Sequence, residues 1–184
     1  MSLLPQAGGW RRDGIAVGDG PLRENEDVMW LQVGDNYADL RLGPEKRWAF
    51  AGTTTVVGSR VTWTHVVETS GDNFEDAGEV VAIPGGFAER GNFHDGQPYL
   101  ELWREVTGPF QPARSAVAEA GTVRVVRLGE RALWVTPTGA VRLLFLGGAW
   151  TLDAVVDAQP EGVEEFLTSG RECPALFLEA LQTA

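Results

Sequence analysis

Cysteine, lysine and histidine are scarce in this chain, and each shortage excludes a class of structure or chemistry. Cys173 is the single cysteine in 184 residues, so no internal disulfide can form. Lys46 is the single lysine, and it lies in a Gly-Pro-Glu-Lys loop where a solvated charge is the simpler interpretation than a Schiff base. The two histidines, His65 and His94, lack the close spacing of zinc ligand pairs. The sequence therefore predicts no metal site and no cofactor.

Long hydrophobic runs and a basic, apolar leader are also missing. No run approaches the roughly 18 apolar residues of a membrane helix, and the first six residues lack the features of a secretory signal. With no disulfide, these absences predict a cytoplasmic protein that does not bind membranes. The net charge of −11, from 26 acidic and 15 basic residues, repels phosphate backbones and predicts no nucleic-acid partner.

Short segments of alternating apolar and polar residues, separated by glycine-containing turns, make up most of the chain. Such segments, recurring about every 8–12 residues, are typical of all-β proteins. We expect strands near residues 10–17, 26–33, 36–42, 48–57, 60–69, 75–83, 86–93, 97–106, 122–128, 131–136, 140–146 and 150–156. A chain of hairpins hides its edges by closing. The prediction is an all-β, antiparallel up-and-down meander closed into a barrel.

Helix is expected only near the C-terminus. Residues 160–167 carry early acids and an apolar stripe, and Pro174 begins a further helical stretch, so the helical segment spans about residues 160–183. Residues 109–121 are open to three interpretations, namely a crossing linker, a strand, or a short helix at 113–120. The length suits a single domain over residues 1–184.

Several predicted strands sort their side chains into two unlike faces. In the strand 36–42, Tyr37, Asp39 and Arg41 share one face, while alanine and leucines share the other. The strand 97–106 repeats this pattern with a tyrosine, a glutamate and a tryptophan opposite leucines, and Trp63 shares a face with His65. The pattern predicts one aromatic and ionisable face backed by one aliphatic face.

Turn positions predict which residues lie opposite one another. A loop at residues 94–96 pairs Glu89 with Glu101 and Gly91 with Tyr99. Tight turns at Gly34-Asp35 and Gly58-Ser59 pair Trp30 with Asp39 and Trp63 with Thr54. Two opposed carboxylates repel each other unless solvent screens them, a cation lies between them, or one stays protonated. In a partly buried cavity the protonated carboxyl would be a proton donor. The simpler alternative is a solvated outer face, which would leave several aromatic rings exposed as well.

Certain strings resemble a known family. Trp10 follows Gly8-Gly9 at the start of the first strand, and the strings Trp63-Thr64-His65, Asp76-Ala77-Gly78, Glu89-Arg90-Gly91 and residues 99–104 (YLELWR) follow. Over residues 8–156 the chain resembles the lipocalin-like, or calycin, barrels, in particular a less studied family without an assigned activity. It has Gly-Trp instead of the usual Gly-x-Trp and lacks the cysteine pairs of secreted lipocalins. The resemblance implies a cup-shaped barrel that holds a small hydrophobic or amphipathic ligand.

Three functions are open at this point. The first is a ligand-binding barrel, monomeric or homodimeric, and not an enzyme. Its expected ligand-binding residues are Trp30, Arg41, Trp63, His65, Glu89, Tyr99, Glu101 and Trp103. The second is a barrel enzyme for proton transfer (isomerisation, cyclisation, decarboxylation or hydrolysis), with Glu101 or His65 as base and Glu89 as acid. The third is a protein-interaction domain that exposes its aromatic rings on an open sheet.

Overall fold

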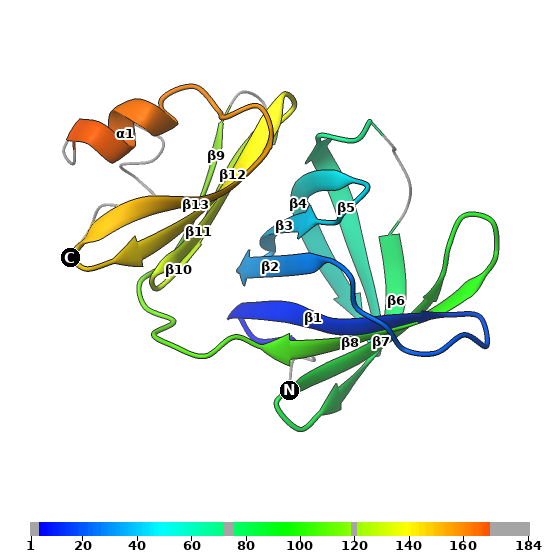
Figure 1. Ribbon diagram of the computed structural model, residues 1–184. Helices are drawn as coiled ribbons and strands as arrows, with labels where there is room; N and C mark the ends of the chain where they lie inside the picture. Colours follow the sequence, from blue (N-terminus) through cyan, green and yellow to red (C-terminus); the bar gives the residue numbers. More distant parts are fainter. Residues whose placement is uncertain (1–3, 72–75, 119–120, 170–184) are drawn as a thin grey trace.

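The computed structural model describes residues 4–71, 76–118 and 121–169 of the chain. This part contains thirteen β-strands and one short helix, α1 (Val163–Ser169), as Figure 1 shows. The predicted all-β, antiparallel class with a C-terminal helix is therefore confirmed.

The first eight strands follow one another as antiparallel hairpins and close into a barrel. They are β1 (Ala7–Val17), β2 (Asp27–Val33), β3 (Asn36–Leu42), β4 (Arg47–Val57), β5 (Arg60–Glu68), β6 (Asp76–Ile83), β7 (Gly86–Asn92) and β8 (Pro98–Glu105). Pairing of β1 with β8, which places Trp10 opposite Glu105, completes the closure. Gly34 and Gly58, with φ of 59° and 65°, allow the tight turns predicted between β2 and β3 and between β4 and β5.

The remaining strands form a second sheet in place of extending the barrel. They are β9 (Ala113–Ala118), β10 (Val123–Leu128), β11 (Arg131–Thr136), β12 (Gly139–Leu146) and β13 (Ala149–Asp157), in the order β13-β12-β11-β10-β9. Closure thus ends at Glu105, before the segment 106–112. This segment includes Pro109 and Pro112, which lack the amide proton that a central strand donates. Of the three interpretations of residues 109–121, the strand is right for Ala113–Ala118.

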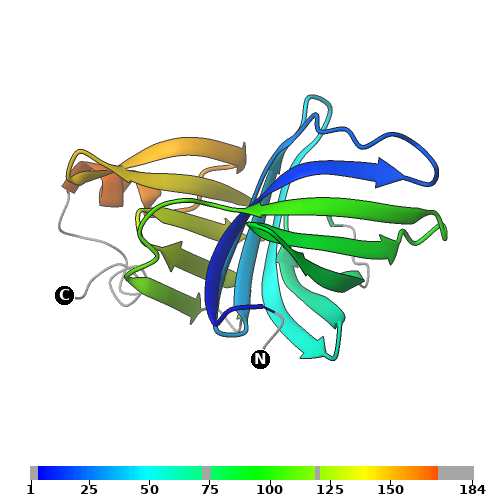
Figure 2. The same cartoon turned by 90° about the horizontal axis from the view of Figure 1, so that it is seen from below.

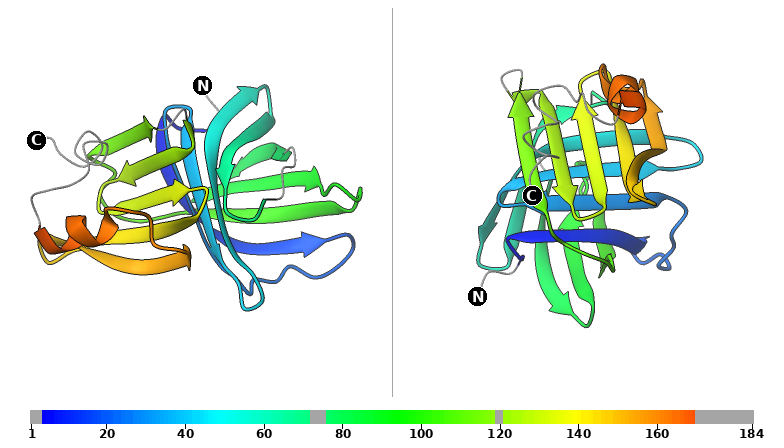
Figure 3. Two further views of the ribbon diagram at one scale, coloured as in Figure 1. Left: turned by 90° about the horizontal axis from the view of Figure 1, so that it is seen from above. Right: turned by 90° about the vertical axis from the view of Figure 1, so that its left-hand side faces the viewer.

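The aliphatic faces of β2, β3 and β4 pack against the second sheet. Leu31 and Leu40 from the barrel and Leu133 and Val135 from the sheet are fully buried in one shared core. Figure 2 and the left panel of Figure 3 show the second sheet lying along this side of the barrel. The outward-pointing leucines are therefore buried between the barrel and the second sheet. The side chains on the other face of these strands point into the barrel.

The helix α1 covers the other face of the second sheet. Val163 is fully buried there, and Phe166 and Leu167 pack against the same core (Figure 3, right panel). No helix in the described part of the chain has the length and apolar character needed to cross a bilayer. The rest of the predicted helical segment, with Cys173 and Pro174, lies outside the described residues.

Candidate ligand-binding cup

The predicted aromatic and ionisable face points into the barrel. Trp30, Trp63 and Trp103 are only 2%, 5% and 3% exposed, in a core separate from that of the outward-facing leucines. Inside the barrel lies a cavity of about 110 Å³, hereafter the cup. It is lined by Trp30, Tyr37, Asp39, Arg41, Trp48, Phe50, Trp63, Asp76, Glu89, Asn92, Phe93, His94, Tyr99, Glu101 and Trp103. Burial of these rings removes the exposed patch on which the interaction-domain hypothesis depended.

Tightly packed aromatic rings form the floor of the cup. Trp30 and Trp103 line the cavity, with ring centroids 5.8 Å apart. Behind them lie Trp10, 4.4 Å from Trp30, and Phe87, stacked 5.9 Å from Trp103. Because these rings fill the barrel beyond the cavity, the space is a cup and not a channel.

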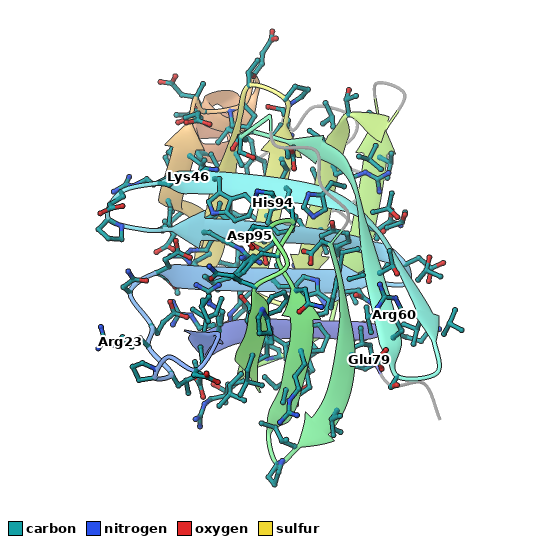
Figure 4. All side chains as sticks on the ribbon, turned by 90° about the vertical axis from the view of Figure 1, so that its right-hand side faces the viewer. Arg23, Lys46, Arg60, Glu79, His94 and Asp95 are labelled. Atoms are coloured by element: carbon teal, nitrogen blue, oxygen red, sulfur yellow. The ribbon has the colours of Figure 1, made fainter. Side chains whose placement is uncertain are left out.

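The loop between β7 and β8 lies at the outer end of the cup. Asn92, Phe93 and His94 line the cavity and are exposed to solvent. Figure 4 shows His94 and Asp95 in front of the barrel strands, with Arg23, Lys46, Arg60 and Glu79 around the outline of this end. Any access to the cavity from this side therefore passes the loop.

One wall of the cup holds a partly buried arginine. The Arg41 guanidinium lies over Trp48 and Phe50, at 4.8 Å and 5.1 Å from the ring centroids. Its Nε donates a 2.9 Å hydrogen bond to Oδ1 of Asp39, which is 3% exposed. The pairing of β2 with β3 places Asp39 opposite Trp30, as the turn predicts. This wall therefore presents positive charge, negative charge and aromatic surface side by side.

The opposite wall carries the predicted carboxylate pair. Glu89 on β7 lies directly opposite Glu101 on β8, and the two are 4% and 5% exposed. Tyr99 donates a 2.7 Å hydrogen bond from Oη to Oε1 of Glu89. A Cβ atom on Gly91, opposite Tyr99, would lie 2.5 Å from that hydroxyl, so the glycine leaves the ring its room. The predicted register is confirmed.

A buried arginine that lies outside the cup holds Glu101. Nη1 of Arg12 donates a 2.7 Å hydrogen bond to Oε1 of Glu101. The other nitrogens of Arg12 bond Glu24 and Glu26, and its side chain is 3% exposed. Arg12 was not among the predicted site residues, although its spacing of two from Trp10 signals a shared face.

Burial shifts the ionisation of the carboxylate pair. It raises the pKa of Glu89 well above its usual range, and the nearby charge of Glu101 adds to this shift. Burial also raises the pKa of Glu101, whereas the positive charges of Arg41 and Arg12 oppose that rise. Burial likewise raises the pKa of Asp39, against the effect of Arg41. Of the pair, Glu89 is therefore the carboxyl group that binds a proton more tightly.

His65 differs from the other predicted site residues, because it does not line the cup. Its ring stacks on Phe50 with centroids 4.2 Å apart, and Nδ1 lies 2.8 Å from Oε2 of Glu68. Burial lowers the pKa of His65, but hydrogen bonds to Asp76 and Glu68 outweigh burial and raise it. Its place behind Phe50 weighs against a role as general base in the cup. The other seven predicted residues line the cavity.

Three buried polar groups of the cup have no hydrogen-bond partner among the described residues. They are the hydroxyl of Tyr37 and the indole nitrogens of Trp30 and Trp103. Leaving a buried polar group unpaired costs about 1–3 kcal/mol. No three histidine, cysteine, aspartate or glutamate side chains form a metal-binding group within the described ranges.

Comparison with known proteins gives a family and a fold. The family model described as Protein HRI1 matches residues 10–147, well over half of the chain. The structure is similar to the crystal structure of the uncharacterized protein YLR301w from Saccharomyces cerevisiae, with 16% sequence identity and a TM-score of 0.65. That similarity covers 87% of this chain and 91% of the yeast chain, and at this identity it supports the fold alone. No curated protein matches the sequence.

Proposed function

The chain belongs to the HRI1 family, and for this member we propose that the barrel binds a small amphipathic molecule in the cup. The observation that carries the proposal is the combination of a 110 Å³ cavity with three buried, unpaired polar groups in its lining. Aromatic walls with a few convergent polar groups are the usual composition of small-molecule sites. The position of the cavity inside the barrel supports the proposal of a lipocalin-like mode of binding.

Polarity of the lining favours an amphipathic ligand over a lipid chain. Arg41, Asp39 and the Glu89–Glu101 pair all border the cavity. A purely apolar ligand would displace water from these groups without replacing its hydrogen bonds, which is unfavourable. A ligand with a flat ring and polar ends satisfies both the walls and the charged groups.

A fragment screen tests the proposal. One-ring amphipathic fragments are screened by saturation-transfer NMR, and hits are titrated by tryptophan fluorescence. Trp63→Leu, in the cup, should weaken binding at least tenfold. The matched control Trp150→Leu, in the second sheet, should leave binding unchanged, because Trp150 packs against Phe145 and Phe166. Equal binding to both variants, or an empty screen, would overturn the proposal.

Proton-transfer chemistry is the second candidate, and the carboxylate pair supports it. A protonated Glu89 beside an ionised Glu101 is an arrangement in which one group donates and the other accepts a proton. Carbon-13 NMR titration of the glutamate carboxyls should show one group titrating well above 4.5, the ordinary value. If all glutamates titrate near that value, this candidate is excluded.

A further inference from the structure

The lining of the cup carries more carboxyl groups than cationic groups. The carboxyl groups belong to Asp39, Asp76, Glu89 and Glu101. Among the described lining residues, Arg41 supplies the guanidinium, and its Nε already binds Asp39. Arg12, which holds Glu101 from outside the cup, is shared with two further carboxylates. Like charges in a buried space repel strongly, so the cup favours a positive group in its occupant.

An independent observation comes from Tyr37. Its side chain is 1% exposed and lines the cup, yet its hydroxyl has no hydrogen-bond partner among the described residues. A hydroxyl oxygen accepts a hydrogen bond from an N–H group. The indole nitrogens of Trp30 and Trp103 are donors only, so the occupant also needs an acceptor atom.

Aromatic walls already hold one cation in this space. The Arg41 guanidinium lies over two rings at distances typical of cation–π contacts. Trp63 and Tyr99 line the same cavity. An ammonium group between the carboxyl groups and these rings would gain both kinds of interaction.

The volume limits the size of the occupant. One water molecule occupies about 10–15 Å³ of such a cavity. A cavity of about 110 Å³ therefore holds on the order of ten non-hydrogen atoms. One aromatic ring with a short chain fits, whereas a steroid or a fatty acyl chain does not.

We infer that the cup binds a small organic ammonium compound, a protonated amine of about ten non-hydrogen atoms with one flat ring and one hydrogen-bond acceptor. This inference rests on the proposed function and names its ligand class. The ammonium group lies among the carboxyl groups, the ring lies against the tryptophans, and the acceptor receives the indole N–H groups.

Binding of a cation should release a proton from the carboxylate pair. The groups that act on Glu89 and Glu101 come from four strands, and they are Tyr99 of β8, Asp76 of β6, Arg41 of β3 and Arg12 of β1. Asp39 of β3 and His94 of the loop between β7 and β8 also line the cup. A proton on Glu89 relieves repulsion in the empty cup. An ammonium group supplies the same relief, so the proton passes to solvent while the amine keeps its own protons.

Three probes of similar size and different charge test the inference on the full chain. Tyramine is cationic, 4-ethylphenol is neutral and 4-hydroxyphenylacetate is anionic at pH 7. Calorimetric titration should show tyramine binding at least tenfold more tightly than the other two. Equal or tighter binding of the phenol or the acetate overturns the inference and leaves the proposed function intact. If none of the three binds while the fragment screen yields cup ligands, the inference also fails alone, and an empty screen overturns both.

Proton release is tested with the same titration in phosphate and in Tris at pH 7. The apparent binding enthalpies should differ between the two buffers, because each released proton is taken up by the buffer. The difference should correspond to the release of up to one proton per bound tyramine. Glu89→Gln should abolish this difference and weaken tyramine binding at least tenfold, because the amide has no proton to lose and no charge to offer. The matched control Glu105→Gln, exposed on the same sheet, should behave like the wild type. Buffer-independent heats in the wild type would overturn the proton coupling.

Discussion

The two faces of strand β3 show two different uses of the same backbone. Outward, Ala38 and Leu40 are fully buried in an apolar cluster against the second sheet. Inward, Tyr37, Asp39 and Arg41 border the cup. The outer face stabilises by apolar burial, about 25 cal/mol per Å². The inner face buries charges whose desolvation offsets most of their mutual attraction. A buried ionic cluster is weak evidence for stability, so the difference is consistent with the proposal that the inner face binds a ligand.

Removing Arg12 should have the largest effect on stability, because it removes the ion pair that holds Glu101 on the inner face. Arg12→Met leaves Glu101 without its 2.7 Å partner, and truncating one side of a buried ion pair costs about 3–5 kcal/mol. Urea denaturation at pH 7 measures the loss. The double variant Arg12→Met/Glu101→Gln should recover much of it, since the orphaned carboxylate is gone. Arg11→Met is the matched control, because that side chain is 54% exposed. A loss no greater than in this control would contradict the prediction.

A truncation on the outer face comes next. Leu40→Ala removes a fully buried side chain between barrel and sheet, for which we expect a loss of about 2–5 kcal/mol. Val57→Ala, at a position that is 74% exposed, should stay within about 0.5 kcal/mol. The same urea series gives both values. Equal effects at the two sites would mean that the interface between barrel and sheet is not formed in solution.

The pH dependence of stability tests the inner face alone, because Glu89 titrates there and the apolar outer face of β3 carries no such group. Since burial raises the pKa of Glu89, the folded protein binds a proton more tightly than the unfolded chain does. The contribution of Glu89 to stability is therefore fully present below about pH 4.5, and it is lost as pH rises through the pKa that Glu89 has in the folded protein. Glu89→Gln lacks this loss, so its stability relative to the wild type should improve as pH rises above 4.5.

His65 does not obscure this comparison. Its raised pKa acts in the same direction, with stability lost as pH rises through a folded value above 6.5. That contribution is common to the wild type and Glu89→Gln, and it cancels in their difference. A difference that stays constant from pH 4 to pH 8 would show that folding leaves the pKa of Glu89 unchanged.

Much of the inner face could be predicted from the sequence. Strand alternation with tight turns fixes which residues share a face and which lie opposite, and the predicted pairs Glu89–Glu101 and Trp30–Asp39 are confirmed. Trp48 and Phe50, whose spacing of two is also visible, were missed although the predicted turn at Gly58 links their strand to that of Trp63. Alternation is therefore sufficient to assign the faces of these strands.

The point of closure could not be predicted in the same way. Every hairpin from β1 to β13 has similar local patterning, and the prolines of segment 106–112 mark a break in the meander without showing that the barrel closes before it. The decisive pairing joins β1 to β8 across about ninety residues of sequence, with a register shift between Arg12 and Gly14. That shift changes which side chains of β1 point inward beyond Arg12, and no local signal predicts it. Arg12 itself shares the inward face of Trp10 and could have been found by alternation.

The smallest expected effect belongs to the exposed ion pair on the outside of the barrel. Nη2 of Arg104 lies 2.6 Å from Oδ2 of Asp13, a shorter contact than that between Arg12 and Glu101, but its side chain is 72% exposed. Water and salt screen such a pair over about 8 Å at physiological ionic strength. Arg104→Gln should therefore leave the urea midpoint unchanged at 0.15 M salt, whereas the loss in Arg12→Met should persist at 0.5 M salt. If both effects faded equally with salt, Arg12 would be solvated and the inner face would lose its buried charge.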